Sequence, residues 1–186
     1  MHSVPTYPHK HSGPVVVAGA AWCLHDDLAR ARDLYGDLPV IAINGAARDV
    51  KADFLYSGHP ERFETHRWVH HQKRLFGDIF TVHSGYKNTP PTDCPLVDFW
   101  WRGTGIARGT SAWAARKMAA FMGFDLVLLC GCPLDPGPYV GHRLGHELML
   151  KESVIDKYRR IIASETEWHE GCLSLSGWTA TFLGSP

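Results

Sequence analysis

The sequence lacks an excess of charge of either sign. Its 186 residues include 19 lysines and arginines and 19 aspartates and glutamates, so the formal net charge is zero. A protein that binds nucleic acid or an anionic membrane through its overall charge needs a surplus of basic residues. The composition therefore argues against a nucleic-acid partner, although it leaves room for a local basic patch.

Long hydrophobic runs and paired cysteines are also missing. No segment approaches the roughly 18 apolar residues that span a membrane, and residues 1–13 lack the apolar core of a signal peptide. The cysteines number five and include no CxxC pair, which excludes a zinc-knuckle spacing and a disulfide framework. We therefore expect no membrane span and a reducing, cytoplasmic location.

Two common nucleotide-binding fingerprints are absent as well. The stretch "GTGIARG" over 103–109 has the spacing GxGxxxG and follows a loop, so it is not the dinucleotide fingerprint. No Walker A sequence occurs. These absences weigh against NAD-linked and P-loop chemistry.

What the sequence does contain is a regular alternation of strand and helix patterns. Apolar runs predict strands over 14–20, 39–45, 52–59, 78–85 and 124–131, and a last short strand and a terminal turn within 171–184. Helical patterns cover 25–35, 60–76, 110–122 and 145–164. This order predicts an α/β, Rossmann-like, three-layer domain, with a mostly parallel sheet and helices on both faces.

The length fits a single domain over 14–186, preceded by a flexible arm over 1–13. Pro60 is expected at a first helical position, and 86–109 is expected to be a long irregular connection. The strand over 124–131 is the most hydrophobic and is expected to be central. Helical spacing predicts two buried faces, formed by Ala114, Met118, Phe121 and Met122 and by Leu148, Ile155 and Ile162.

Small and polar residues follow every predicted strand. Because ligands bind outside the carboxyl ends of the strands in open α/β sheets, agreement among these loops favours one shared ligand cleft. Ordinary turns also use such residues, so each loop alone has a second explanation. The candidates at the strand ends include Gly19, Asn44, Gly45, Ser57, His83 and Asp135.

Thr110 and Ser111 stand at the start of the predicted helix over 110–122. Free backbone N–H groups and two hydroxyls suit a phosphate there, and an ordinary helix cap is the equally weighted alternative. The twelve histidines invite a metal hypothesis. However, His66, His70 and His71 lack the glutamate of a zincin and are typical of a solvated helix face. His142 and His146 follow a glycine- and proline-rich stretch, where a neutral histidine is able to accept a proton.

Several of these motifs resemble one bacterial family. The block "GTSAWAARKMAAFMGFDLVLLCGCPLD" (109–135) is similar to the S-G, helix, glycine, apolar strand and G-x-D block of the Rossmann-like sialyltransferases and the related DUF115/MptE-like proteins. "VVVAGAAWCL", "VIAINGA" and "ADFLYSGHPERF" resemble its first three strands and their loops. The tail "YVGH" resembles the sialyltransferase stretch that holds a proposed general base. Order and spacing agree over roughly 14–135.

The resemblance implies a glycosyltransferase-like enzyme that takes a sugar from a CMP-sugar type of donor, without a metal cofactor, and gives it to a glycan or small-molecule acceptor. It implies that Gly19 and Asn44 contact the nucleotide. Thr110, Ser111 and Asp135 would line its phosphate or ribose, and His142 would be the catalytic base. Gly45 and Ser57, at the second and third strand ends, complete the nucleotide-binding set that we expect.

One departure from the family pattern and a second branch of the family keep alternatives open. Trp22 and Cys23 stand where the family has proline and serine, so a hydrogen-bonding hydroxyl is lost. In the MptE-like branch the chemistry is a magnesium-dependent transfer of pyrophosphate, for which Asp26, Asp27 or Asp135 would help to hold the metal. A non-catalytic nucleotide-binding module is the remaining alternative. Trp100 and Trp101 suit a sugar platform, a dimer contact or the core.

Overall fold

A computed structural model describes residues 7–8, 10–77, 81–85, 96–101, 106, 108–138 and 151–186. Within them, seven strands form one sheet in the order β5-β4-β3-β2-β1-β6-β7, and all paired neighbours are parallel. This confirms the predicted α/β, Rossmann-like fold. The strands are β1 (Pro14–Ala18), β2 (Val40–Ile43), β3 (Phe54–Tyr56), β4 (Thr81–Ser84), β5 (Phe99–Trp100), β6 (Leu126–Cys130) and β7 (Cys172–Ser174).

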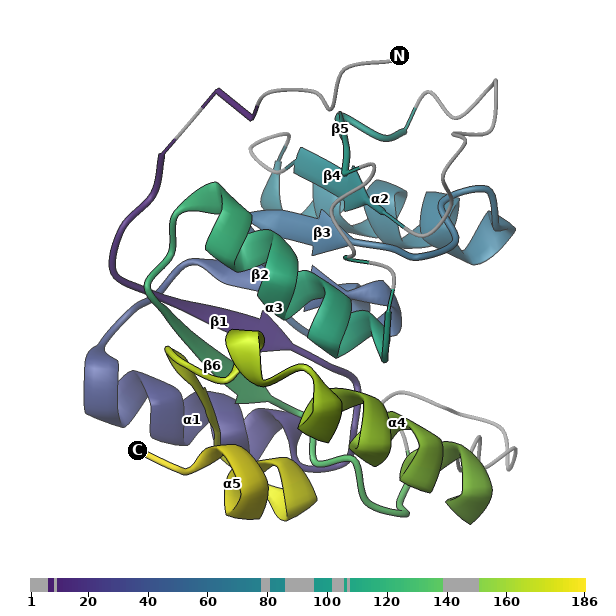
Figure 1. The fold of residues 1–186 in the computed structure, drawn as a ribbon. Coiled ribbons are helices and arrows are strands. Elements are labelled where there is room, and N and C mark those ends of the chain that lie inside the picture. Colours follow the sequence, from purple (N-terminus) through teal and green to yellow (C-terminus); the bar gives the residue numbers. More distant parts are fainter. Residues whose placement is uncertain are drawn as a thin grey trace.

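Helices cover both faces of this sheet (Figure 1). On one face, Val16 and Ala18 of β1 pack with residues of α1 (Leu24–Tyr35), α2 (Phe63–Phe76) and the 3-10 helix η1 (Asn44–Arg48). On the other, Val15 and Val17 pack with residues of α3 (Ser111–Met122) and α4 (Glu152–Ser164). Successive strand residues point to opposite faces, so β1 serves two cores. No described helix is long and apolar enough to cross a membrane.

The predicted helices end where their glycines stand. Gly36, Gly77 and Gly123 follow α1, α2 and α3 with φ of +77°, +83° and +103°. Positive φ is favourable for glycine and costly for other residues, so each glycine stops its helix. The strand predicted over 124–131 corresponds to β6, which lies inside the sheet between β1 and β7. Of the residues predicted to face inward on α4, Ile155 and Ile162 are buried, and Leu148 lies outside the described residues.

Four local predictions are wrong. Pro60 does not begin a helix, because a turn from His59 to Arg62 precedes α2. The connection over 86–109 contains β5, whose two residues are too few to show a period. The terminal turn is the short helix α5 (Gly177–Leu183), and a 3-10 helix, η2 (Thr166–Trp168), lies between α4 and β7. Phe121 is 45% exposed, although Ala114, Met118 and Met122 on the same predicted face are buried.

The described residues of the predicted arm lie against the domain. The Tyr7 hydroxyl hydrogen-bonds His11 Nε2 at 2.9 Å, and the His11 ring stacks on Phe124 with centroids 4.6 Å apart. The His11 backbone N–H donates to Met122 O at 2.9 Å. Since residues 1–6 and 9 lie outside the described part, the flexible arm over 1–13 and the single domain over 14–186 stay predictions.

Candidate functional site

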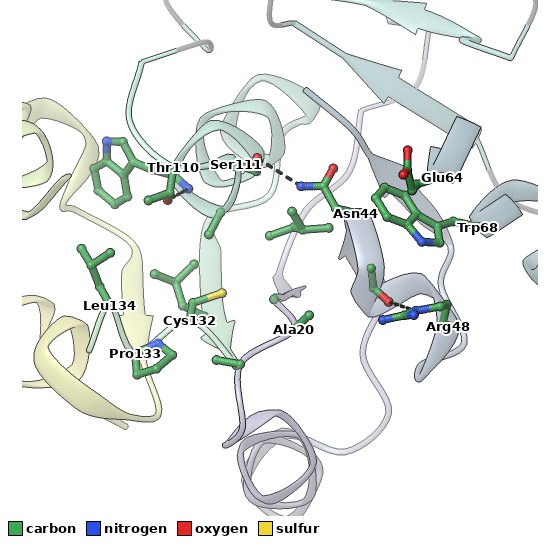
Figure 2. Close-up of a pocket in the computed structure, with 18 of the residues that line it drawn as sticks. Ala20, Asn44, Arg48, Glu64, Trp68, Thr110, Ser111, Cys132, Pro133 and Leu134 are labelled. Atoms are coloured by element: carbon green, nitrogen blue, oxygen red, sulfur yellow. Dashed lines mark hydrogen bonds between the residues drawn. The ribbon is translucent and has the colours of Figure 1, made fainter. Parts of the chain in front are cut away.

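A cleft of about 860 Å³ opens at the carboxyl ends of the central strands (Figure 2). The chain leaves β1 through α1 to reach β2 on one side, whereas β6 pairs with the other side of β1. This is the topological switch point at which open α/β sheets bind ligands. The cleft is lined by residues that follow β1, β2 and β6, by the start of α3 and by one side of α2.

The floor of the cleft is formed by two glycines in close contact. Gly19 follows β1, and a Cβ built on it would stand 2.5 Å from Gly131 O and 2.6 Å from Cys132 Sγ. Gly131 follows β6 with φ of +63°, and a Cβ there would collide with Gly19 O. Backbone hydrogen bonds hold the two loops together, from Gly19 N to Cys130 O at 2.8 Å and from Ala21 N to Gly131 O at 3.1 Å. Glycine is therefore required at both positions by the close packing of the two loops against each other and against Cys132 Sγ.

Asn44, directly after the carboxyl end of β2, has an uncommon backbone conformation. Its φ is +48°, and among the described residues only Leu134 shares a positive φ without being glycine. Both residues line the cleft. Asparagine tolerates this region better than most side chains. The Asn44 Nδ2 donates to Ser111 Oγ at 3.3 Å, so the side chain joins the end of β2 to the start of α3 (Figure 2).

The N-terminus of α3 opens onto the same cleft. Thr110 is its N-cap, and the Thr110 Oγ1 accepts a hydrogen bond from Trp113 N at 3.1 Å. Ser111 and Ala112, the first two helical residues, line the cleft. Their N–H groups come too early in the helix for an intrahelical acceptor, so they are available to an anion. Thr110 thus forms the predicted cap, and the cap leaves the anion-binding donors in place.

Asp135 lines the cleft, but protein donors hold both of its carboxylate oxygens. Arg159 Nη2 donates to Oδ1 at 2.6 Å, and the Trp178 N–H donates to Oδ2 at 2.8 Å. Arg159 Nη2 also donates to Leu134 O at 3.1 Å. The carboxylate therefore fixes the loop after β6 to α4 and α5.

Asp27 performs a similar task beneath the floor. It is buried at 4% exposure, its Oδ2 accepts from Gly131 N at 2.8 Å, and its Oδ1 accepts from the Ser176 hydroxyl. Burial, together with the Asp27 charge, raises the pKa of the Cys23 thiol to about 12. Cys23 is thus a buried and unreactive thiol. This role of Asp27 in holding the floor has no signal in the sequence.

Ser57 does not line the cleft with the other predicted nucleotide-binding residues. Its side chain is fully buried, and its Oγ lies 3.1 Å from Thr65 Oγ1 and accepts from His59 N at 3.3 Å. These bonds stabilise the turn between β3 and α2. The cleft brings together the remaining predicted nucleotide-binding residues, which are Gly19, Asn44, Gly45, Thr110, Ser111 and Asp135.

One side of the cleft is a basic wall that the sequence reasoning missed. We name it the α2 wall, and its members come from α2, from the residue before it and from the end of η1. His70 and His71 belong to it, whereas the exposed His66 stays outside, so this helix face borders the cleft rather than open solvent alone. The only available signal was the helical spacing of the basic residues. The α2 wall consists of Arg48, Arg62, Glu64, Arg67, Trp68, His70, His71 and Arg74.

The fold of this chain is similar to those of two solved structures of bacterial enzymes. One is the sialyltransferase CstII from Campylobacter jejuni, solved with the substrate analogue cytidine-5'-monophosphate, at 13% identity and a TM-score of 0.57, covering 92% of this chain and 84% of that one. The other is the MAf glycosyltransferase from Magnetospirillum magneticum AMB-1, at 14% identity and a TM-score of 0.58, covering 98% of this chain. Both are glycosyltransferases.

This likeness shows the glycosyltransferase-like fold alone. The present chain spans 34% of the length of the MAf glycosyltransferase. No family model and no curated protein matches the sequence.

The predicted catalytic histidine falls outside the described part of the chain. His142 and His146 both lie within 139–150, so their roles stay predictions. Among the described residues, no group of three or more His, Cys, Asp or Glu side chains is arranged to hold a metal ion. Trp101 is a core residue, since it is 6% exposed and donates from Nε1 to His83 Nδ1 at 3.0 Å.

His83, a candidate at the end of the fourth predicted strand, is a core histidine. It is fully buried and stacks on Phe99 and Trp101. Since Nδ1 accepts from Trp101, the proton of the neutral ring belongs on Nε2, which lies 2.7 Å from Thr81 Oγ1. Burial lowers the pKa of His83 to about 3, and the nearby His11 adds to the shift.

This pKa shift predicts a pH dependence of stability. The unfolded state binds a proton near pH 6.5 and the folded state only near pH 3, so the stabilisation is complete above about 6.5 and is lost as the pH falls towards 3. We expect His83 to contribute a slope of about 1.4 kcal/mol per pH unit in that window. Urea unfolding of the wild type and of His83→Gln from pH 4 to 7 measures the difference in slope. Parallel curves for the two proteins would contradict the assignment.

Proposed function

We propose that the chain is a glycosyltransferase-like enzyme that transfers a sugar from a CMP-sugar type of donor to a glycan or small-molecule acceptor. The observation that carries the proposal is the pairing of two features in one cleft. The two closely packed glycine loops at Gly19 and Gly131 lie at the switch point, and the capped N-terminus of α3 points donors into the same space. This combination suits a nucleotide whose phosphate lies at the helix end.

The proposed chemistry is a direct displacement. The acceptor hydroxyl oxygen forms a bond to the anomeric carbon while the bond from that carbon to the phosphate oxygen breaks, and the hydroxyl proton passes to His142. The N–H groups of Ser111 and Ala112 would stabilise the negative charge that develops on the departing nucleotide, and Asn44 would orient it. Most of the rate acceleration would come from positioning and from this charge stabilisation.

The magnesium-dependent alternative of the MptE-like type finds less support. It needs a free carboxylate near the phosphates, but protein donors hold both oxygens of Asp27 and both oxygens of Asp135. Asp26 lies exposed on α1 and is not among the cleft-lining residues. A non-catalytic nucleotide-binding module would share the cleft. A cytoplasmic location remains our expectation for each of these functions, in line with four free cysteines among the described residues.

Thermal shift measurements with CMP, CTP, UDP, GDP and ATP, each with magnesium and with EDTA, test the proposal. We expect CMP to raise the melting temperature in EDTA, because a ligand that binds only the folded state stabilises it by about 2.7 kcal/mol at a hundredfold excess over Kd. A triphosphate that acts only with magnesium would favour pyrophosphoryl transfer. No shift with any nucleotide would contradict the proposed function.

Two substitutions at the start of α3 locate the phosphate in the same assay. Ser111→Ala removes the hydroxyl, whereas Ser111→Pro also removes the N–H. Proline is tolerated at the first helical position, and the extended Thr110, with φ of −77° and ψ of 164°, is compatible with a following proline. We expect Ser111→Pro to weaken the affinity for CMP by about tenfold, since a charge-assisted hydrogen bond contributes about 1.5–3 kcal/mol. Ser111→Ala should weaken this affinity less.

His142→Ala should retain the CMP thermal shift and lose turnover.

A further inference from the structure

The α2 wall gives the cleft a local charge that the whole chain lacks. The wall holds four arginines and one glutamate, so positive charge exceeds negative charge there by three, while the formal net charge of the chain is zero. A cleft lined by one sign of charge concentrates field lines and attracts ligands of the opposite sign. The ligand of this wall is therefore expected to be an anion.

The arginines of the wall are not committed to the protein's own carboxylates. Among the described residues, Arg62, Arg67 and Arg74 form no ion pair; the ion pairs of the other arginines are Arg32–Asp37, Arg108–Glu165, Arg159–Asp135 and Arg159–Asp156. Arg62, Arg67 and Arg74 are exposed, and they line the cleft. Each guanidinium thus offers its fork of donors to a ligand.

These basic side chains form a stripe rather than a point. Arg67, His71 and Arg74 are spaced by four and three residues on α2, which places them on one side of the helix. From Arg62 to Arg74 the rise of a helix amounts to about 18 Å. A single phosphate or carboxylate needs only a small part of that length. The stripe suits a ligand that carries several anionic groups along its length.

The stripe lies away from the donor half of the cleft. The floor glycines follow β1 and β6, whereas α2 packs on η1 and lies towards β3, beyond β2 in the sheet. Figure 2 shows Asn44 between the two halves, with Ser111 on one side and Trp68 and Arg48 on the other. Two hydrogen bonds fix the position of Arg48. Its Nε donates to Gly45 O at 3.3 Å, and its own carbonyl oxygen lies 3.1 Å from His71 Nε2.

We propose that the α2 wall binds the acceptor, and that this acceptor is a carbohydrate with repeated carboxylate or phosphate groups. The inference rests on the proposed function, which assigns the α3 side of the cleft to the donor. Guanidinium groups recognise both anions in a two-pronged geometry. Trp68, half-buried in the wall, adds a flat apolar surface for a sugar ring. Single-stranded nucleic acid fits less well, because it is bound by series of aromatic side chains, and Trp68 is the only large aromatic residue of the described wall.

Binding of tetragalacturonate, which has a carboxylate on every sugar, tests the acceptor assignment against uncharged maltotetraose. We expect tetragalacturonate to bind and maltotetraose not to bind in isothermal titrations. The double variant Arg67→Gln/Arg74→Gln should weaken the affinity for tetragalacturonate by about tenfold and leave the CMP thermal shift unchanged. Arg160→Gln, on the exposed part of α4 and outside the cleft lining, is the matched control and should change neither ligand.

The outcomes separate the two proposals. Absent or variant-independent binding of tetragalacturonate would overturn the acceptor assignment while a CMP shift still supported the proposed function. Equal loss of CMP and tetragalacturonate in the arginine variant would also overturn it, because the wall would then belong to the donor. Tighter binding of a thymidine tetranucleotide with the same arginine dependence would replace the carbohydrate by nucleic acid. Failure of CMP to bind the wild type would count against the proposed function itself.

Discussion

Gly131→Ala is expected to destabilise the fold by about 3 kcal/mol or more and to abolish nucleotide binding. Two costs combine at this position. The φ of +63° is unfavourable for alanine, at about 1–2 kcal/mol, and the new Cβ collides with the Gly19 carbonyl oxygen. A backbone atom is unable to move aside as a flexible side chain does, so overpacking adds about 1–3 kcal/mol. The movement that relieves the collision would open the floor of the cleft.

Gly36→Ala is the matched control for this substitution. Its φ of +77° and ψ of −160° are also unfavourable for alanine, but no atom lies within 4 Å of the built Cβ. We therefore expect only the conformational cost of about 1–3 kcal/mol and no change in nucleotide affinity. Urea denaturation and the CMP thermal shift measure the two effects. Similar destabilisation by Gly131→Ala and Gly36→Ala would show that the contact with Gly19 has no energetic importance.

Lys117→Met is expected to destabilise the protein by about 3–5 kcal/mol, because it removes one partner of a buried ion pair. Lys117 Nζ lies 2.6 Å from Glu165 Oε2, and the two side chains are 2% and 7% exposed. Trp113 Nε1 donates to the same carboxylate oxygen at 2.7 Å. Without the lysine, a buried carboxylate charge would keep the Trp113 hydrogen bond and a longer contact with the exposed Arg108.

A double-mutant cycle distinguishes the loss of charge pairing from the loss of packing. Glu165→Gln keeps an acceptor for Trp113 and removes the charge, so Lys117→Met/Glu165→Gln should be more stable than Lys117→Met alone, with a coupling of about 0.5–3 kcal/mol. Lys157→Met on the exposed side of α4 should stay within about 0.5 kcal/mol of the wild type. Additive effects of the two single variants in urea denaturation would contradict a role for the ion pair.

The sequence was sufficient for the sheet and most helices because each one carries a local signal. β1 and β6 are unbroken apolar runs, and Gly36 and Gly77 end their helices. β5 has two residues and gained its place only by pairing with β4. Phe121 shares a helical face with buried residues, yet it stays 45% exposed because it lies on the outer margin of that face, against Trp101 and Trp168.

The candidate site was predictable where it depends on strand ends, and less so elsewhere. Gly19, Asn44 and Ser111 reach one cleft because the carboxyl ends of parallel strands meet at one edge. Ser57 follows a strand too, but its hydroxyl turns inward to Thr65, and sequence spacing does not determine that rotation. The arginines of the α2 wall belong to a helix that is amphipathic in an ordinary way, so only the tertiary position of α2 shows that their exposed side borders a cleft.

The buried carboxylate of Asp27 has a consequence for the thermodynamics of ligand binding. It holds the loop after β6 through Gly131 and the loop after β7 through Ser176, both from the first turn of α1. The floor is thus preorganised before any ligand arrives. Association normally loses free energy to the ordering of loops at a binding site. Here the loops are ordered during folding, so a larger part of the free energy of each protein–ligand contact contributes to affinity.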